Sequence, residues 1–183
     1  DPDDDNDGYT DAEEATAGTS AMNNASKPGL DFGLVAYYPF DGNASDMSGN
    51  GNDGTVNGAT LGKDRFGVAG KAYSFDGVND YIQTPVNSNS LPLSFSVWFE
   101  LESITGERSI IDSDRSGHYG HSLILGYGNG DGDLDVQFHN GSIDTGFVPI
   151  PNKWQHVVVN YKDVIQFFHN GQLIVQQEFC GKG

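Results

Sequence analysis

From Leu34 onward, the sequence is a series of short apolar runs, each ended by glycine, asparagine or aspartate. The runs are too short for typical helices, and several alternate apolar and polar residues with the period of two expected of a half-buried strand. In 93–99, Leu93, Phe95 and Val97 share one face, while two serines and Trp98 share the other. The runs expected to form strands are 34–40, 55–61, 71–75, 80–85, 93–101, 108–112, 121–127, 133–139, 154–161, 164–169 and 172–179.

Turn residues between these runs support an all-β fold. Asn170-Gly171 separates two of the expected strands, and this pair is the dipeptide preferred by a type I′ hairpin turn, where both central residues need positive φ. The chain contains 25 glycines, and no long helical period follows residue 33. Strands this numerous, with turns this frequent, predict a sandwich or jelly roll. Before them, 15–32 is expected to be a short helix followed by a linker.

The charge balance limits the partners of this protein. With 9 basic and 26 acidic residues, the formal net charge is −17, so nucleic acids and anionic membranes are unsuitable ligands and divalent cations are suitable ones. No apolar run approaches the roughly 20 residues that span a bilayer, which argues against membrane insertion. The single cysteine, Cys180, cannot form an internal disulfide.

Residues 3–14 have the spacing of a calcium-binding loop. Carboxylates stand at loop positions 1, 3, 5 and 9, a glycine at position 6 allows the sharp turn, and a glutamate at position 12 can close the shell. The expected ligands are the side chains of Asp3, Asp5, Asp7, Asp11 and Glu14 and the backbone carbonyl of Tyr9. The alternative interpretation is a disordered acidic tail, because runs of like charge are usually unstructured.

The stretch DPDDDNDGYTDAEEATAGTS, with little chain before its loop to supply the incoming helix of an EF-hand, resembles one thrombospondin type 3 repeat. The resemblance covers the first 25 residues and implies a calcium-filled spacer. Loops of this kind with weak affinity fill outside the cell, so it also implies a secreted or cell-surface protein.

The remainder resembles laminin-G-like, concanavalin A-like jelly rolls of the bacterial type. The matching segments are GLVAYYPFDGNASDMSGNGNDGTVNGATL, RFGVAGKAYSFDGVNDYIQTP, LSFSVWFEL, WQHVVVNY and FFHNGQLIV. The resemblance implies two antiparallel sheets with ligands at a rim or on the concave face, and domains at 1–28 and 29–183. The family continues past the Asn-Gly hairpin with strands that would lie beside 34–40. We therefore expect this jelly roll to lack its last strands or to be completed by another chain.

Two loops rich in oxygen ligands, 41–53 and 75–81, are candidates for a second calcium site. As the resemblance implies, the loops could lie close together, with Asp41, Asp46, Asp76 and Asp80 as ligands. The alternative is that these residues only stabilise turns, since aspartate hydrogen-bonds its own backbone readily.

A sugar site typically combines an aromatic platform with a few fixed polar groups. The sequence around 114–129 fits this description, and the candidate ligand-binding residues are His118, Tyr119, His121, Tyr127 and Asn129. The alternatives are an ordinary glycine-rich connection, or a transition metal held by the two histidines, for which a third ligand is lacking. Trp98 and Trp154 are expected to pack on a sheet rather than to bind sugar.

Catalytic patterns are not found. Glutamates occur only at 13, 14, 100, 102, 107 and 178, and none fits the paired glutamates of the jelly-roll glucanases. We therefore expect a calcium-dependent carbohydrate-binding module of a secreted protein that is not itself an enzyme, although a catalytic domain could lie elsewhere in the parent protein. The alternative is an adhesion or structural domain that recognises protein or acts as a spacer.

Overall fold

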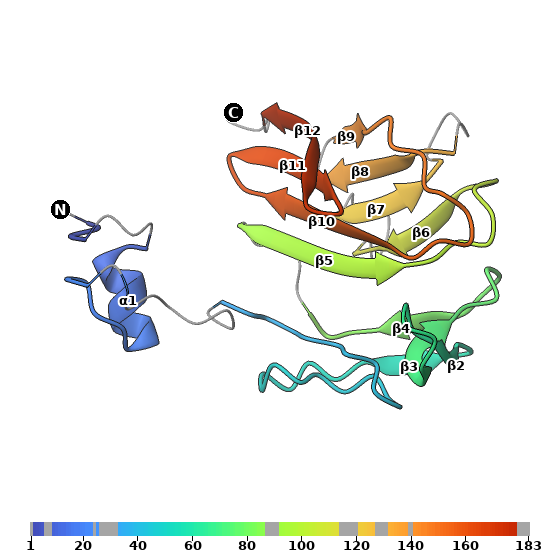
Figure 1. The fold of residues 1–183 in the computed structure, drawn as a ribbon, viewed down its shortest axis with the longest axis horizontal. Coiled ribbons are helices and arrows are strands. Elements are labelled where there is room, and N and C mark those ends of the chain that lie inside the picture. The colour runs from blue at the N-terminus through green and yellow to red at the C-terminus, as the bar shows by residue number, and fades with distance from the viewer. Residues whose placement is uncertain are drawn as a thin grey trace. The chain divides into compact units, whose positions relative to one another are not determined.

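The computed structural model describes residues 2–5, 9–23, 25, 33–86, 92–113, 121–126, 132–138 and 141–178. These residues form twelve β-strands and one short helix, and every pairing between strands is antiparallel (Figure 1). The chain divides into two compact units, Asp1–Val86 and Asn87–Gly183. The prediction of an all-β chain is confirmed.

The second unit is a sandwich of two four-stranded sheets. One sheet has the order β12-β11-β10-β5, and the other has the order β6-β7-β8-β9. Their bounds are β5 Leu93–Phe99, β6 Arg108–Ile111, β7 Ser122–Leu125, β8 Leu134–Phe138, β9 Gly141–Asp144, β10 Gln155–Tyr161, β11 Val164–His169 and β12 Gln172–Glu178.

The core of this unit lies between the two sheets. Alternate residues of β10 and β11 are buried there, as the period of two requires. Tyr161 crosses the sandwich, because its hydroxyl donates to the backbone carbonyl of Gln137 on the other sheet at 2.9 Å. The fully buried members of the core are Leu123, Leu125, Leu134, Val136, Val157, Val159, Tyr161, Ile165 and Phe167.

The first unit contains the helix and two small sheets. Helix α1 (Asp11–Ala17) begins with a capping box in which Thr10 and Glu13 satisfy each other's backbone N–H groups, and it ends at Gly18, whose φ is +74°. Strand β1 (Thr55–Asn57) pairs with β4 (Tyr81–Gln83), and β2 (Thr60–Lys63) pairs with β3 (Ala69–Ser74). The helix thus starts earlier than the expected 15–32 segment.

Two expected strands differ from the structure. Residues 34–40 are not in a strand, because side chains of the following loop bind them instead: Asn50 Nδ2 donates to the Leu34 carbonyl at 2.7 Å, and Asn52 Nδ2 to the Val35 carbonyl at 2.9 Å. The expected strand 55–61 is divided at Gly58, whose φ is +79°. Strand β9 was not predicted.

The expected hairpin between β11 and β12 is confirmed. Asn170 and Gly171 both have positive φ, at 47° and 81°, as a type I′ turn requires. The described part of the chain has no helix with the length and hydropathy needed to traverse a bilayer.

Candidate functional site

The acidic N-terminal segment folds back on itself. The Asp11 backbone N–H donates to the Pro2 carbonyl at 2.9 Å, and the Asp4 N–H donates to Asp11 Oδ1 at 3.0 Å. Asp11, the first residue of helix α1, is thereby hydrogen-bonded through both its backbone and its side chain to residues at the start of the loop. This arrangement differs from a disordered tail.

Two carboxylates of this segment fit a cation. Glu14 is fully buried, and both carboxylate oxygens of Asp5 are buried without a hydrogen-bond partner among the described residues. A buried carboxylate without a donor is stabilised if a cation binds it. Asp3 and Tyr9 are half-buried, and Asp7 lies outside the described residues. No three of the described loop carboxylates come within 4.8 Å of one another.

The four aspartates expected at a second calcium site all bind other groups of the protein. Asp46 accepts from the Tyr37, Ser48 and Asn52 backbone N–H groups at 2.9 Å each. Desolvation would raise the pKa of Asp46, but these donors outweigh it and lower the pKa far below its usual range. Asp76 accepts from the Val78 N–H at 2.8 Å, which lowers its pKa.

The other two aspartates of that set also have protein partners. Asp41 forms an ion pair with Lys71, and Asp80 accepts from the backbone N–H of Asp76 at 2.9 Å. Asp46, Asp76 and Asp80 therefore stabilise their loops, as the turn interpretation expects, whereas Asp41 pairs with a lysine of β3. The second calcium site stays a prediction.

A different group of three carboxylates converges in the second unit. One oxygen each of Asp133, Asp135 and Asp144 lies within 4.8 Å of the others. Asp135 and Asp144 are directly opposite on β8 and β9, and Asp133 and Asp135 are only 2% and 3% exposed. Such a group could hold a divalent cation. The signal in the sequence is the Asp-Leu-Asp alternation at the start of β8, which sequence reasoning did not use.

Most of the predicted sugar-binding loop lies outside the described residues, namely His118, Tyr119, Tyr127 and Asn129. His121 is described and is 5% exposed. Its ring packs edge-on against Tyr161, with 4.5 Å between the centroids. His121 therefore contributes to the core in this structure, and the loop as a sugar site stays a prediction.

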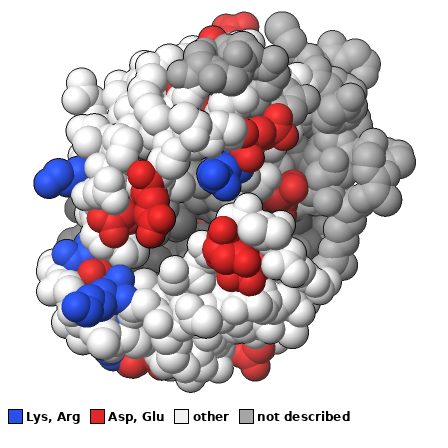
Figure 2. Space-filling model, turned by 90° about the vertical axis from the view of Figure 1, so that its right-hand side faces the viewer, with Lys and Arg blue, Asp and Glu red and all other residues white. Residues whose placement is uncertain are grey.

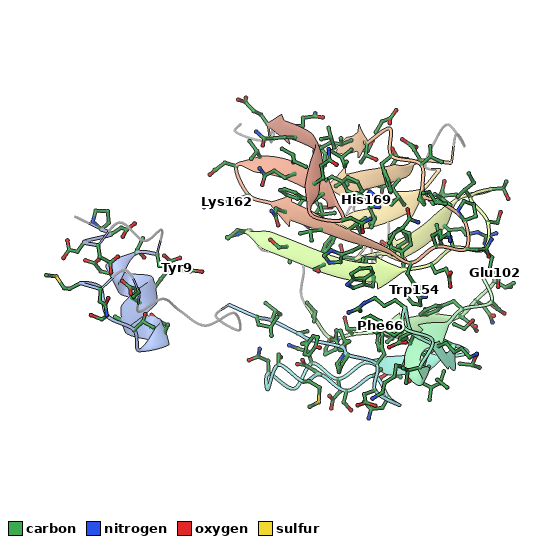
Figure 3. The ribbon with its side chains drawn as sticks, in the orientation of Figure 1. Tyr9, Phe66, Glu102, Trp154, Lys162 and His169 are labelled. Atoms are coloured by element: carbon green, nitrogen blue, oxygen red, sulfur yellow. The ribbon has the colours of Figure 1, made fainter. Side chains whose placement is uncertain are left out.

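An open pocket of about 560 Å³ lies at one end of the sheet that contains β5 and β10. It is lined by Trp98, Trp154, His156, Asn170 and Gly171, which we call the aromatic site. Trp98 is 43% exposed, although it was expected only to pack on the sheet. Its ring stacks on that of His156, with 4.9 Å between the centroids and 25° between the planes. Figure 3 labels Trp154 in this region.

Strand register and one turn hold the aromatic site together. Trp98 of β5 and His156 of β10 are directly opposite, and His156 Nε2 is hydrogen-bonded to Ser96 Oγ at 2.7 Å. The hairpin turn is bound to the same strand, because the Asn170 N–H donates to the His156 carbonyl at 2.8 Å and Asn170 Oδ1 accepts from the His156 N–H at 3.1 Å. The site is therefore preformed.

The sequence carried one signal for this site. Trp98 alternates with the core-facing residues of β5 and shares its face with two serines, so a large aromatic ring stands on a polar face. What the sequence could not supply is the register that brings His156 opposite Trp98, and the hydrogen bonds that hold the predicted Asn170-Gly171 turn against His156.

Acidic side chains occur in separate groups on the face shown in Figure 2, and most of the described surface there is neither acidic nor basic. Among the described residues that line the aromatic site, none is acidic, and His156 is the one ionisable group. The site thus offers ring faces, an amide and backbone groups rather than charge.

Comparison with known proteins identifies the fold. Residues 76–181, more than half of the chain, match the laminin-G-like family described as the concanavalin A-like lectin/glucanases superfamily. A comparison with curated proteins gave no match. Among solved structures, the chain is similar to domain 4 of AbnA, a GH43 extracellular arabinanase from Geobacillus stearothermophilus, in complex with arabinotriose. The identity is 21%, the match covers 79% of this chain and 74% of that one, and the TM-score is 0.61. With two four-stranded antiparallel sheets in its second unit, this chain belongs to the concanavalin A-like lectin/glucanases superfamily.

Proposed function

We propose that this protein is a carbohydrate-binding module that holds sugar at the aromatic site and has no catalytic activity of its own. The observation that carries the proposal is the solvent-open Trp98 ring, stacked on His156 beside Trp154. Sugar rings have apolar faces that stack on aromatic side chains and hydroxyl edges that need polar partners. Asn170 and His156 offer such partners next to the ring.

The comparison supports the same class of ligand. The similar structure is a domain in complex with arabinotriose, and that domain comes from an extracellular enzyme. By analogy, this chain is proposed to be a binding domain of a secreted or cell-surface protein. The side chains of the site carry the proposal, because a shared fold alone does not determine function.

Calcium is proposed to act on the N-terminal segment rather than on the sugar. Asp3, Asp5, Asp7, Asp11 and Glu14 would hold the ion together with the Tyr9 carbonyl. The ion would neutralise carboxylates that are costly to bury, of which Asp5 and Glu14 are the described examples. In this proposal, calcium stabilises the protein. Removal of calcium weakens sugar binding only if the loss of the ion also disturbs the second unit.

A screen against soluble and insoluble polysaccharides tests the function. It is run in millimolar calcium and repeated in chelator, with circular dichroism to verify folding under both conditions. We expect binding to at least one neutral polysaccharide in calcium. A folded protein that binds nothing in the screen would refute the proposal.

One observation favours the alternative, an adhesion domain that recognises protein. The first unit exposes several large apolar side chains, among them Phe66 at 74%, Phe75 at 49% and Val78 at 84%. Exposed apolar residues are common at protein interfaces when they form a continuous patch. A silent screen would make this the leading hypothesis.

A further inference from the structure

A second open pocket lies on the same sheet as the aromatic site. It has a volume of about 340 Å³ and is lined by Pro92, Ser94, Asn160, Tyr161, Lys162, Asp163, Val164 and Gln166. The aromatic site contains residues at the beginning of β10, and this second pocket contains residues at its end. Figure 3 labels Trp154 and Lys162 at these opposite ends.

The register shows that both pockets open on one face of the sheet, the face opposite the core, which we call the outer face. Along β5, Trp98, Ser96 and Ser94 occupy this face, and their partners on β10 are His156, Val158 and Asn160. All three β5 residues are exposed, whereas the intervening residues are more buried. A ligand can therefore reach both pockets from the same side.

The second pocket is built around a row of amides. On the outer face, Ser94, Asn160, Gln166 and Gln176 are neighbours on β5, β10, β11 and β12, and we call them the amide row. Asn160 Nδ2 donates to Gln166 Oε1 at 3.4 Å, and Gln166 Nε2 donates to Gln176 Oε1 at 2.9 Å. These bonds orient the amides while leaving them further donors and acceptors.

Apolar side chains join the two ends. Between the aromatic site and the amide row, Val158, Phe168 and Leu173 are neighbours on β10, β11 and β12, and Leu173 is 44% exposed. The outer face thus changes from aromatic, through apolar, to amide. Ser94 is four residues from Trp98 along β5, a distance of about 14 Å in an extended strand. This distance exceeds the length of a single sugar ring.

We propose that the outer face is one extended site for an uncharged polysaccharide chain, with one sugar stacked at Trp98 and later sugars hydrogen-bonded to the amide row. This inference rests on the proposed function and extends it from sugar in general to internal segments of a neutral chain. Amides and hydroxyls pair with sugar hydroxyls as both donors and acceptors.

The charges favour a neutral chain over a polyuronide. The outer-face positions named above carry no carboxylate or ammonium group, and the charged residues at the second pocket, Lys162 and Asp163, have opposite signs. Glu178 of β12, which lies opposite Val164 on the same face, adds a negative charge. The whole protein has a net charge of −17, which repels an acidic polymer.

The test is the dependence of affinity on chain length. Arabino-, xylo-, manno- and cello-oligosaccharides, each from the disaccharide to the hexasaccharide, are titrated by calorimetry into the full chain. In any series that binds, we expect the hexasaccharide to bind at least tenfold tighter than the disaccharide. In the double variant Asn160→Ala/Gln166→Ala, the hexasaccharide should lose roughly tenfold in affinity, the value of about two net hydrogen bonds, while the disaccharide is unaffected.

Two controls make the result specific. Gln177→Ala removes an exposed amide from β12 at a position that alternates with the amide row, and it should change neither affinity. Trp98→Ala should weaken every ligand of the series. Equal affinity for short and long ligands, or equal losses for both in the double variant, would overturn the extended site and leave the proposed function standing.

Failure of the proposed function has a different signature. No binding by any series or by the polysaccharides of the screen would overturn both proposals. A dimer in analytical ultracentrifugation that Trp98→Ala dissociates would show that a second copy of the chain, rather than a glycan, covers the outer face.

Discussion

Replacement of Trp98 by alanine removes the ring on which the proposed function depends, and the structure sets the size of the expected loss. The residue is 43% exposed, which corresponds to about 100 Å² for a tryptophan. A sugar ring that covers half of this area removes ~50 Å² of indole and a similar area of its own apolar face from water. At ~25 cal/mol per Å², the contact contributes about 2.5 kcal/mol, or roughly 60-fold in Kd.

Calorimetric titration with the best ligand of the screen measures this loss. Trp98→Phe should recover part of the affinity, because a smaller ring still offers a face. Phe66→Ala is the matched control, since it removes an even more exposed aromatic ring (74%) from the first unit and should leave Kd unchanged. If Trp98→Ala is folded and its Kd changes less than threefold, the stacking argument is wrong.

Three further predictions concern stability. Calcium at tenfold its Kd should raise the free energy of unfolding by about 1.4 kcal/mol. In thermal melts, the variant Asp5→Asn should lose this stabilisation. If Asp144→Asn loses it instead, the ion binds the group formed by Asp133, Asp135 and Asp144. Burial lowers the pKa of His169. The free energy of unfolding should therefore be highest above about pH 6.5 and fall as the pH drops toward the lower pKa of the folded state, because the unfolded state binds the proton first. Urea unfolding of His169→Gln should lack this fall, and a pH profile identical to that of the original protein would contradict the prediction. Tyr161→Phe deletes the hydroxyl that donates to the Gln137 carbonyl and should cost about 1–2 kcal/mol in urea unfolding, whereas an unchanged midpoint would mean that the bond between the sheets contributes nothing.

Strands with a clear alternation were predictable from the sequence, because a buried face imposes its period on the residues. Strands β5 and β10 are the examples, and the Asn170-Gly171 turn was predictable because few other pairs adopt its dihedral angles. Residues 34–40 have the composition of a strand, yet side chains from 50 and 52 bind their carbonyls. A propensity cannot reveal which partner a backbone group finds.

The candidate site was less predictable than the fold, because it depends on pairings between distant residues. Trp98 and His156 are far apart in sequence, and only the β5–β10 register makes them neighbours. The same holds for Asp135 and Asp144 on β8 and β9. His121 fits a surface site by residue type, but its ring is buried against Tyr161. Residue type suggested a candidate chemistry, whereas the location of each side chain depended on the pairing of strands.

The alternation of β5, β10 and β11 separates recognition from folding. Core-facing positions such as Val157 and Val159 hold the sandwich together, while His156, Val158 and Asn160 between them face outward. Outward residues can therefore be exchanged at little cost to the core, provided that the strand keeps its length. Relatives with the same two sheets are accordingly free to diverge in ligand, and a library restricted to the outer-face positions of these strands should yield folded variants with new glycan specificities.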